Sequence, residues 1–170
     1  MAKQYSWQQA FARQAQSDFA VYQTLDTLPV DTAVHKCHRL HYLQMTCEKL
    51  TKAYLCSTGS RPEDLQHSHK YIAKNLTIIA RQAFFETERK PASARESLKQ
   101  IKLLAREIEL LAPSVDENGR RPDNVEYPWS DQSGRLVVPA EYAFPTLDLL
   151  TATTGRTLLK LIERAIARLL

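Results

Sequence analysis

Hydrophobic residues recur at steps of three and four along most of the chain, the spacing that places side chains on one face of an α-helix. Five stretches show it, and we expect one helix from each. The first two stripes are Trp7, Phe11, Ala15, Asp18, Tyr22 and Leu25, then Leu40, Leu43, Cys47, Leu50 and Tyr54. The next two are Leu65, His69, Ile72, Leu76, Ile79 and Ala83, then Leu98, Ile101, Ala105, Ile108 and Ala112. The last is Leu147, Thr151, Thr154, Leu158, Leu161, Ala165 and Leu169.

Helix caps and prolines mark the expected ends of these helices. Ser6 with Gln9 has the spacing of a capping box, and Pro29 follows the first stripe. The other expected boundaries are a cap at Asp31 or Thr32, a C-cap at Gly59, Pro62 in a first turn, a capping box of Ser93 with Glu96, and a stop at Pro113. We expect the fifth helix to run from about Thr146 to the C-terminus.

Five antiparallel helices with mostly short connections predict an all-α, up-and-down bundle, with residues 1–170 forming one domain. Residues 113–139 interrupt the pattern as a long irregular insertion that is rich in proline and glycine. Within it, 125–129 and 136–138 flank a turn-like segment, so a small hairpin is an option. We expect Tyr127 and Trp129 to pin this loop to the helices, with ligand binding as the alternative.

The composition agrees with a globular helical protein. The chain has 170 residues, 44% of them hydrophobic and 25% charged, which is enough for a core and unlike a disordered chain. Only four glycines are present, too few for the many tight turns of an all-β fold. The net charge of +4 permits an anionic partner without requiring one.

Cysteines and histidines add little chemistry. Three cysteines are a poor disulfide framework, and neither Cys37 nor Cys47 has surroundings that predict a nucleophile. Neither a signal peptide nor a membrane span is evident, so we expect a cytoplasmic protein. His35, His38 and His41 follow at steps of three, but no supporting carboxylate stands among them, so neither a metal nor a cofactor is predicted.

Two segments carry a family resemblance. Residues 12–25 (ARQAQSDFAVYQTL) and 38–55 (HRLHYLQMTCEKLTKAYL) resemble the first two helices of a HEPN domain, a small helical domain often found beside minimal nucleotidyltransferases. The matching positions are Tyr42, Gln44, Glu48, Lys49, Lys52, His69 and Ile72. Glu126-Tyr127-Pro128 stands where many members carry Arg-Tyr-Pro.

The resemblance implies either a ribonuclease or an inactive binding module. Many HEPN domains are metal-independent ribonucleases with an Arg and a His four to six positions later, usually paired across a homodimer. A His of near-neutral pKa can move the 2′-hydroxyl proton while an Arg stabilises the developing charge. Arg61 and His67 match that spacing, but Pro62 replaces the usual polar residue and the pair precedes the family's usual position. Other members are inactive binding modules or neutralised toxin relatives.

Two rows of basic residues follow helical spacing. They are Arg95, Lys99, Lys102 and Arg106, and then Arg156, Lys160, Arg164 and Arg168. Two such rows could border a groove for RNA phosphates, and the alternative is the solvated outer face of any bundle.

The sequence therefore favours a HEPN-like, non-catalytic interaction module that forms a homodimer. Its expected partner is RNA, a nucleotide or a nucleotidyltransferase-type protein. One alternative is a ribonuclease using Arg61 and His67, and another is a structural or regulatory protein without a nucleic-acid ligand.

Overall fold

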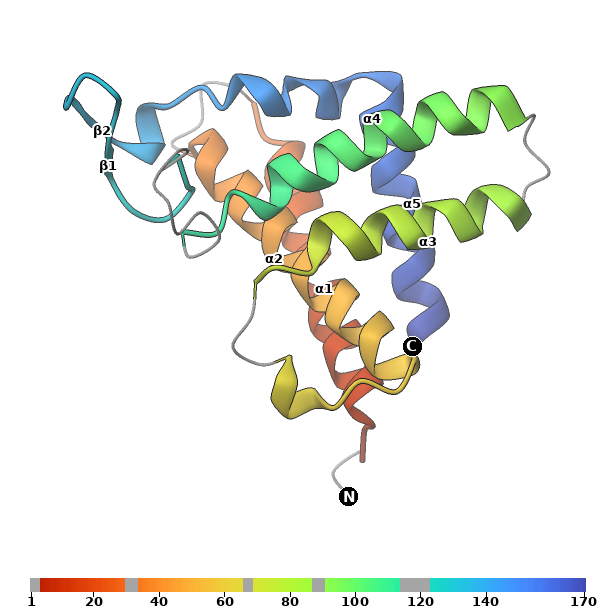
Figure 1. The fold of residues 1–170 in the computed structure, drawn as a ribbon. Coiled ribbons are helices and arrows are strands. Elements are labelled where there is room, and N and C mark those ends of the chain that lie inside the picture. The colour runs from red at the N-terminus through yellow and green to blue at the C-terminus, as the bar shows by residue number, and fades with distance from the viewer. Residues whose placement is uncertain (1–3, 30–33, 66–68, 87–90, 114–122) are drawn as a thin grey trace.

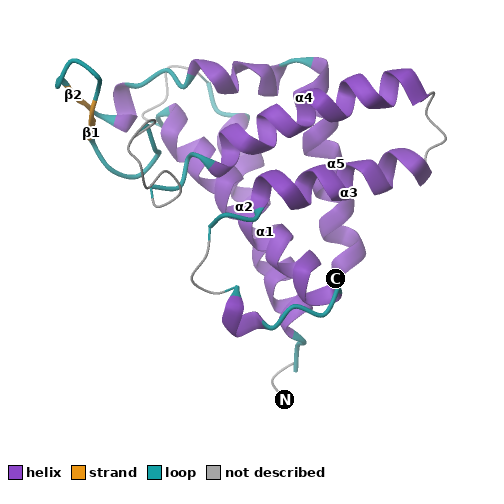
Figure 2. Ribbon diagram, viewed as in Figure 1, coloured by secondary structure: helices purple, strands orange, loops and turns teal. Residues whose placement is uncertain are grey.

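A computed structural model of the chain describes residues 4–29, 34–65, 69–86, 91–113 and 123–170. In those residues five α-helices make up most of the fold, which confirms the all-α prediction (Figures 1 and 2). The helices are α1 (Trp7–Asp26), α2 (Lys36–Ser57), α3 (Ile72–Glu86), α4 (Pro91–Glu109) and α5 (Thr153–Leu169). Short 3₁₀ helices are η1 (Pro62–Asp64), η2 (Pro139–Glu141) and η3 (Pro145–Thr151).

The helices lie in two layers that share one hydrophobic core. The helices α1 and α2 form an antiparallel pair, and α3 and α4 form a second antiparallel pair that crosses in front of α1, α2 and α5 (Figure 1). All five helices supply buried apolar side chains to the largest core cluster. Central members from successive helices are Ala15, Leu50, Ile72, Ile101 and Leu158.

The two N-terminal helices begin differently. The capping box of α1 is present, since the Gln9 amide donates to Ser6 Oγ and the Ser6 amide donates to Gln9 Oε1, both at 3.2 Å. In contrast, α2 has His35 as its N-cap, without a side-chain hydrogen bond. The expected caps Asp31 and Thr32 lie outside the described residues.

Helix α2 ends next to the predicted glycine: the C-cap is Thr58, and Gly59 is the residue that follows it. Gly59 has φ = +96°, a left-handed conformation that strains any residue with a Cβ. The Ser60 amide then donates to the Leu55 carbonyl at 3.0 Å, and the Gly59 amide to the Cys56 carbonyl at 3.1 Å. These two bonds satisfy carbonyls that the end of the helix leaves without partners.

The next two helices begin at other residues than predicted. The third stripe starts at Leu65, but α3 begins at Ile72, because the chain first forms η1 and then a segment in which His69 binds α2 through its side chain. Pro91 starts α4 two residues before the expected cap Ser93. Proline suits a first helical position because its φ is fixed near the helical value.

The predicted fifth helix is broken in two. Instead of one helix from Thr146, the chain forms η3, passes through Ala152 in an extended conformation (ψ 170°), and starts α5 at Thr153. This corner lets Leu147 and Leu150 enter the core before the chain turns across the other helices. Gly155 permits the corner, because a Cβ there would lie 2.3 Å from the Leu150 carbonyl oxygen.

The hairpin in the irregular stretch is present. Strands β1 (Trp129–Ser130) and β2 (Leu136–Val137) pair antiparallel, with Trp129 opposite Val137. Asp131 closes the turn, since its Oδ1 accepts from the amides of Ser133 at 2.9 Å and Arg135 at 3.0 Å. Residues 114–122 of this stretch lie outside the described residues.

Candidate nucleic-acid interface

Most of the polar residues that carry the family resemblance are inside the protein. Glu48 accepts hydrogen bonds from Lys52 Nζ at 2.7 Å and Gln44 Nε2 at 3.1 Å. The side chains of Glu48 and Lys52 are only 9% and 5% exposed. The cluster is therefore part of the helix packing and does not offer these groups to a partner.

His69 joins this cluster from the segment before α3. Its Nδ1 lies 2.6 Å from Glu48 Oε2. Burial alone would raise the pKa of Glu48, but hydrogen bonds from Lys52 and His69 outweigh it and lower that pKa. An ionised carboxylate only accepts, so Nδ1 of His69 carries the proton. The contact ties the segment that precedes α3 to α2.

Asp18, the polar residue in the first hydrophobic stripe, belongs to a second buried ion pair. Asp18 accepts from Lys49 Nζ at 2.6 Å and from Gln14 Nε2 at 3.1 Å. Both members of the ion pair are largely buried between α1 and α2. Asp18 thus links the two helices from within the apolar face.

The structure describes one half of the candidate ribonuclease pair. Arg61 immediately precedes η1, and its guanidinium donates to both carboxylate oxygens of Asp64, at 3.1 and 3.2 Å. That pair is exposed on the surface. His67 lies outside the described residues, so the pairing of Arg61 with His67 stays a prediction.

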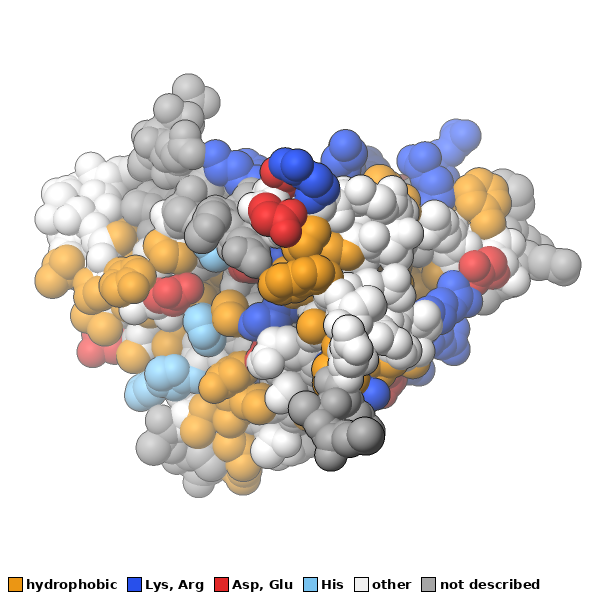
Figure 3. Space-filling model, turned by 90° about the horizontal axis from the view of Figure 1, so that it is seen from below, with side chains coloured by type: hydrophobic (Ala, Val, Ile, Leu, Met, Phe, Trp, Pro, Cys, Tyr) orange, Lys and Arg blue, Asp and Glu red, His pale blue; other side chains and the backbone are white. Residues whose placement is uncertain are grey.

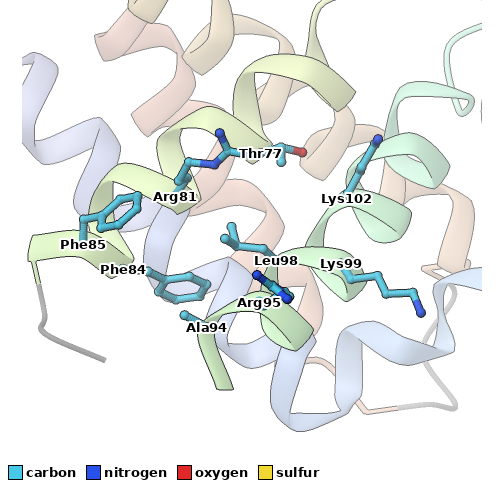
Figure 4. Close-up of a pocket in the computed structure, with 9 residues that line it drawn as sticks. All are labelled: Thr77, Arg81, Phe84, Phe85, Ala94, Arg95, Leu98, Lys99 and Lys102. Atoms are coloured by element: carbon cyan, nitrogen blue, oxygen red, sulfur yellow. The ribbon is translucent and has the colours of Figure 1, made fainter. Parts of the chain in front are cut away.

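Three residues of the first basic row border a groove between α3 and α4 (Figure 4). The groove has a volume of about 580 Å³. Its lining residues are Thr77, Arg81, Phe84 and Phe85 from α3, and Ala94, Arg95, Leu98, Lys99 and Lys102 from α4. We call this site the α3–α4 groove.

The α3–α4 groove combines an apolar surface with several positively charged side chains. Four exposed cations, Arg81, Arg95, Lys99 and Lys102, surround the apolar lining residues, and the described part of the lining includes no carboxylate. Within the described ranges, the structure shows no ion pair to any of the four. Such a groove attracts an anion and can also bury apolar surface of a ligand.

The groove has two chemically different ends. Because α3 and α4 are antiparallel, Phe84 and Phe85 lie toward the end of the groove that Ala94 occupies, whereas Thr77 lies toward the end that Lys102 occupies (Figure 4). At 1.5 Å per residue, the row from Arg95 to Lys102 on α4 spans about 10 Å. The aromatic rings thus lie at one end, and the lysines extend toward the other.

Arg106, the fourth member of that row, has a structural role. Its Nη1 donates to Glu109 Oε1 at 2.7 Å, and Glu109 Oε2 accepts from the Ala73 amide at 3.0 Å. Ala73 is in the first turn of α3, where amides lack partners within the helix and favour a negative charge. Arg106 therefore helps to fix α4 to the start of α3.

The second basic row belongs to another part of the surface. Arg164 and Arg168 line a separate hollow of about 190 Å³ between α2, α3 and α5, and Arg168 pairs with Glu86. Arg156 donates to the Thr151 carbonyl, and Lys160 is exposed. Positive side chains are visible along the upper and right-hand margins of the molecule in Figure 3.

The two rows do not border one groove. The residues of α3 that line the α3–α4 groove are 77, 81, 84 and 85, and those that line the other hollow are 79, 82, 83 and 86. At 3.6 residues per turn these two sets occupy opposite sides of α3. The structure therefore separates the row on α4 from the row on α5.

The two aromatic residues at the hairpin, Trp129 and Tyr127, differ in burial. Trp129 is buried and makes an edge-to-face contact with Tyr142, with ring centroids 5.2 Å apart. Tyr127 points outward and is largely exposed. Trp129 thus fastens the loop as expected, and Tyr127 does not.

The remaining candidates carry little reactive chemistry. In the part of the chain that the structure describes, no three His, Cys, Asp or Glu side chains are grouped as they would be to hold a metal ion. Cys37 and Cys47 are buried, and burial raises the pKa of both thiols. None of the helices described has the length and hydrophobicity needed to cross a membrane.

Comparisons of this chain with protein-family models, curated proteins and solved structures found no match. The resemblance to HEPN domains therefore rests on the motif residues alone. Sequence reasoning missed the contribution of α3 to the groove, namely Arg81 and Phe85. Their signal is the spacing of Thr77, Arg81 and Phe85 at steps of four, which becomes meaningful once α3 is known to lie beside the basic row of α4.

Proposed function

We propose that this chain is a non-catalytic, HEPN-like binding domain that holds RNA in the α3–α4 groove. The observation that carries the proposal is the set of four exposed cations around an apolar surface, without a carboxylate among the described lining residues. RNA supplies the complementary pair of features, phosphates for the cations and bases for the apolar surface.

The length of the charged row favours a polyanion over a small anion. A single phosphate or carboxylate group contacts one or two cations, whereas the row on α4 spans about 10 Å and Arg81 adds a fourth cation from α3. Successive phosphates of one strand can occupy such a row. If all four cations contact phosphates, the affinity for a single strand falls with salt with a log–log slope of about −3.

The homodimer implied by the resemblance would use another surface. A two-fold axis at the groove would bring four cations opposite four identical cations, which is unfavourable. We therefore propose that a second copy, or a nucleotidyltransferase-type partner, binds away from the groove and leaves it open to RNA. Light scattering that showed a strict monomer would remove the dimer from the proposal.

The test uses two double variants with the same charge change. Lys99→Gln with Lys102→Gln removes two groove cations, and Lys160→Gln with Arg164→Gln removes two exposed cations on α5. Binding of a fluorescent 12-nucleotide single-stranded RNA is measured by anisotropy from 50 to 200 mM salt. The groove variant should flatten the log–log slope by about 1.4, and the α5 variant should keep the slope of the unaltered protein. Equal effects of both variants would mean that the groove is not the site.

The ribonuclease alternative is tested on the same RNA. The unaltered protein and a His67→Ala variant are incubated with RNA at low salt, and cleavage and binding are read on one gel. Under the proposal both proteins bind the RNA and leave it intact. Cleavage that disappears in the variant would instead establish a catalytic domain that uses His67.

A further inference from the structure

Phe85 is the most exposed large hydrophobic side chain that the structure describes. It is 79% exposed at one end of the α3–α4 groove, whereas its neighbour Phe84 is buried in the core. Arg81 lies one helical turn before Phe85, and Arg95 lines the groove from α4 (Figure 4). An aromatic ring left in water at the end of a groove lined by cations needs a structural explanation, and packing within the described residues does not supply one.

We infer that Phe85 is a stacking platform for one unpaired base, so that the groove takes RNA as a single strand and excludes the duplex. The inference rests on the proposed function and specifies its ligand. Arg81 and Arg95 hold the phosphates that flank the stacked base, and Lys99 and Lys102 hold the next phosphates along α4.

The chemistry of the groove distinguishes a single strand from a duplex. An A-form duplex presents phosphates and 2′-hydroxyls and keeps the faces of its bases stacked inside. It could contact the four cations but could not place a base on Phe85 or fill the apolar surface formed with Ala94 and Leu98. A single strand can splay out one base and stack it on an aromatic ring.

The same features favour a nucleic acid over an acidic peptide. Asp and Glu side chains match the cations, but they carry no flat apolar group for an exposed aromatic ring. A nucleotide joins a flat π-face to a charge in every repeat. Binding of an acidic peptide is therefore one of the results that would contradict the inference.

The test combines substitutions of Phe85 with three RNA ligands. Because the ring is exposed, Phe85→Ala and Phe85→Trp should both fold. The ligands are a 12-nucleotide single strand, its duplex, and an abasic strand with the same number of phosphates. Phe85→Ala should lower the affinity for the single strand roughly 5- to 150-fold, and Phe85→Trp should preserve or raise that affinity. Binding of the abasic strand should be weak and the same in both variants.

Two patterns of results separate the inference from the proposed function. If Phe85→Ala left the affinity for the single strand unchanged while Lys99→Gln with Lys102→Gln reduced it, the groove would bind phosphates without stacking, and only the inference would be wrong. If neither substitution changed the affinity, RNA binding in the groove would be wrong and the inference with it. Equal affinities for single strand and duplex, or displacement of the RNA by an equally charged acidic peptide, would also overturn the inference.

Discussion

The buried ion pair of Glu48 and Lys52 should show strong energetic coupling. Lys52→Met removes the ammonium 2.7 Å from a carboxylate that is 9% exposed, and Glu48→Leu removes the carboxylate from an ammonium that is 5% exposed. Removing one member of a buried ion pair leaves the other charge desolvated without that ion pair and costs about 3–5 kcal/mol. Each single variant should therefore lose about that much free energy of unfolding.

The double variant should be more stable than either single variant. Replacing both charges with apolar side chains of similar size removes the desolvation cost together with the attraction, and such exchanges are often neutral. Gln44 loses a buried acceptor and His69 a partly exposed one, so a residual loss of about 1–3 kcal/mol is expected. The coupling energy of the cycle would then be at least about 3 kcal/mol.

Urea unfolding followed by circular dichroism measures these free energies. With a slope of about 2 kcal/mol per molar urea, each single variant should lower the midpoint by roughly 2 M. Asp64→Ala, which breaks the exposed pair with Arg61, is the matched control and should leave the midpoint almost unchanged. A double variant less stable than both singles, with a loss near their sum, would refute the assignment of a coupled buried pair.

Two further predictions concern pH and a close backbone contact. Burial raises the pKa of Glu48, yet its hydrogen bonds to Lys52 and His69 lower it below the ordinary 4.5, so its stabilisation is present above that value and is lost as pH falls through the folded pKa. The urea midpoint should therefore drop more steeply below about pH 5 in the unaltered protein than in the double variant, and parallel declines would contradict this. Gly155→Ala should destabilise the protein by about 1–3 kcal/mol, although Ala favours a helix, because its Cβ would meet the Leu150 backbone at 2.3 Å. Thermal unfolding at an unchanged or higher Tm would show that the corner before α5 can relax.

The sequence predicted the parts of the fold that local periodicity determines. The stripe of α4 is buried at Ile101, Ala105 and Ile108, because a regular spacing on a long helix specifies one core-facing side. The capping box of Ser6 could also be predicted from the sequence, because it depends only on two residues that are three positions apart. The hairpin followed from a turn between two short apolar segments.

The corner before α5 depends on contacts that local patterns do not reveal. Leu147 and Leu158 fit one helical stripe, yet the chain bends between them so that η3 and α5 pack on different parts of the core. Gly155 marks the place only because the backbone of Leu150 lies against it. Helical periodicity alone therefore predicted one helix where the structure has two.

Only the α4 side of the α3–α4 groove could be predicted from the sequence. The row that contains Arg95, Lys99 and Lys102 is evident from its spacing on one helix. Its partners Arg81 and Phe85 come from the neighbouring helix, and the second basic row lies elsewhere, which only the packing of α3 shows. Residue spacing identified the charges but not the surface that they share.

Mapping of the RNA contact by backbone amide chemical shifts tests the central proposal most directly. A 12-nucleotide single-stranded RNA is added at low salt to the ¹⁵N-labelled protein. The expected result is a set of shifts on α3 between Thr77 and Phe85 and on α4 between Ala94 and Lys102, with α5 around Lys160 unchanged. Shifts confined to α5, or none at RNA concentrations that saturate a site of millimolar affinity, would contradict RNA binding in the α3–α4 groove.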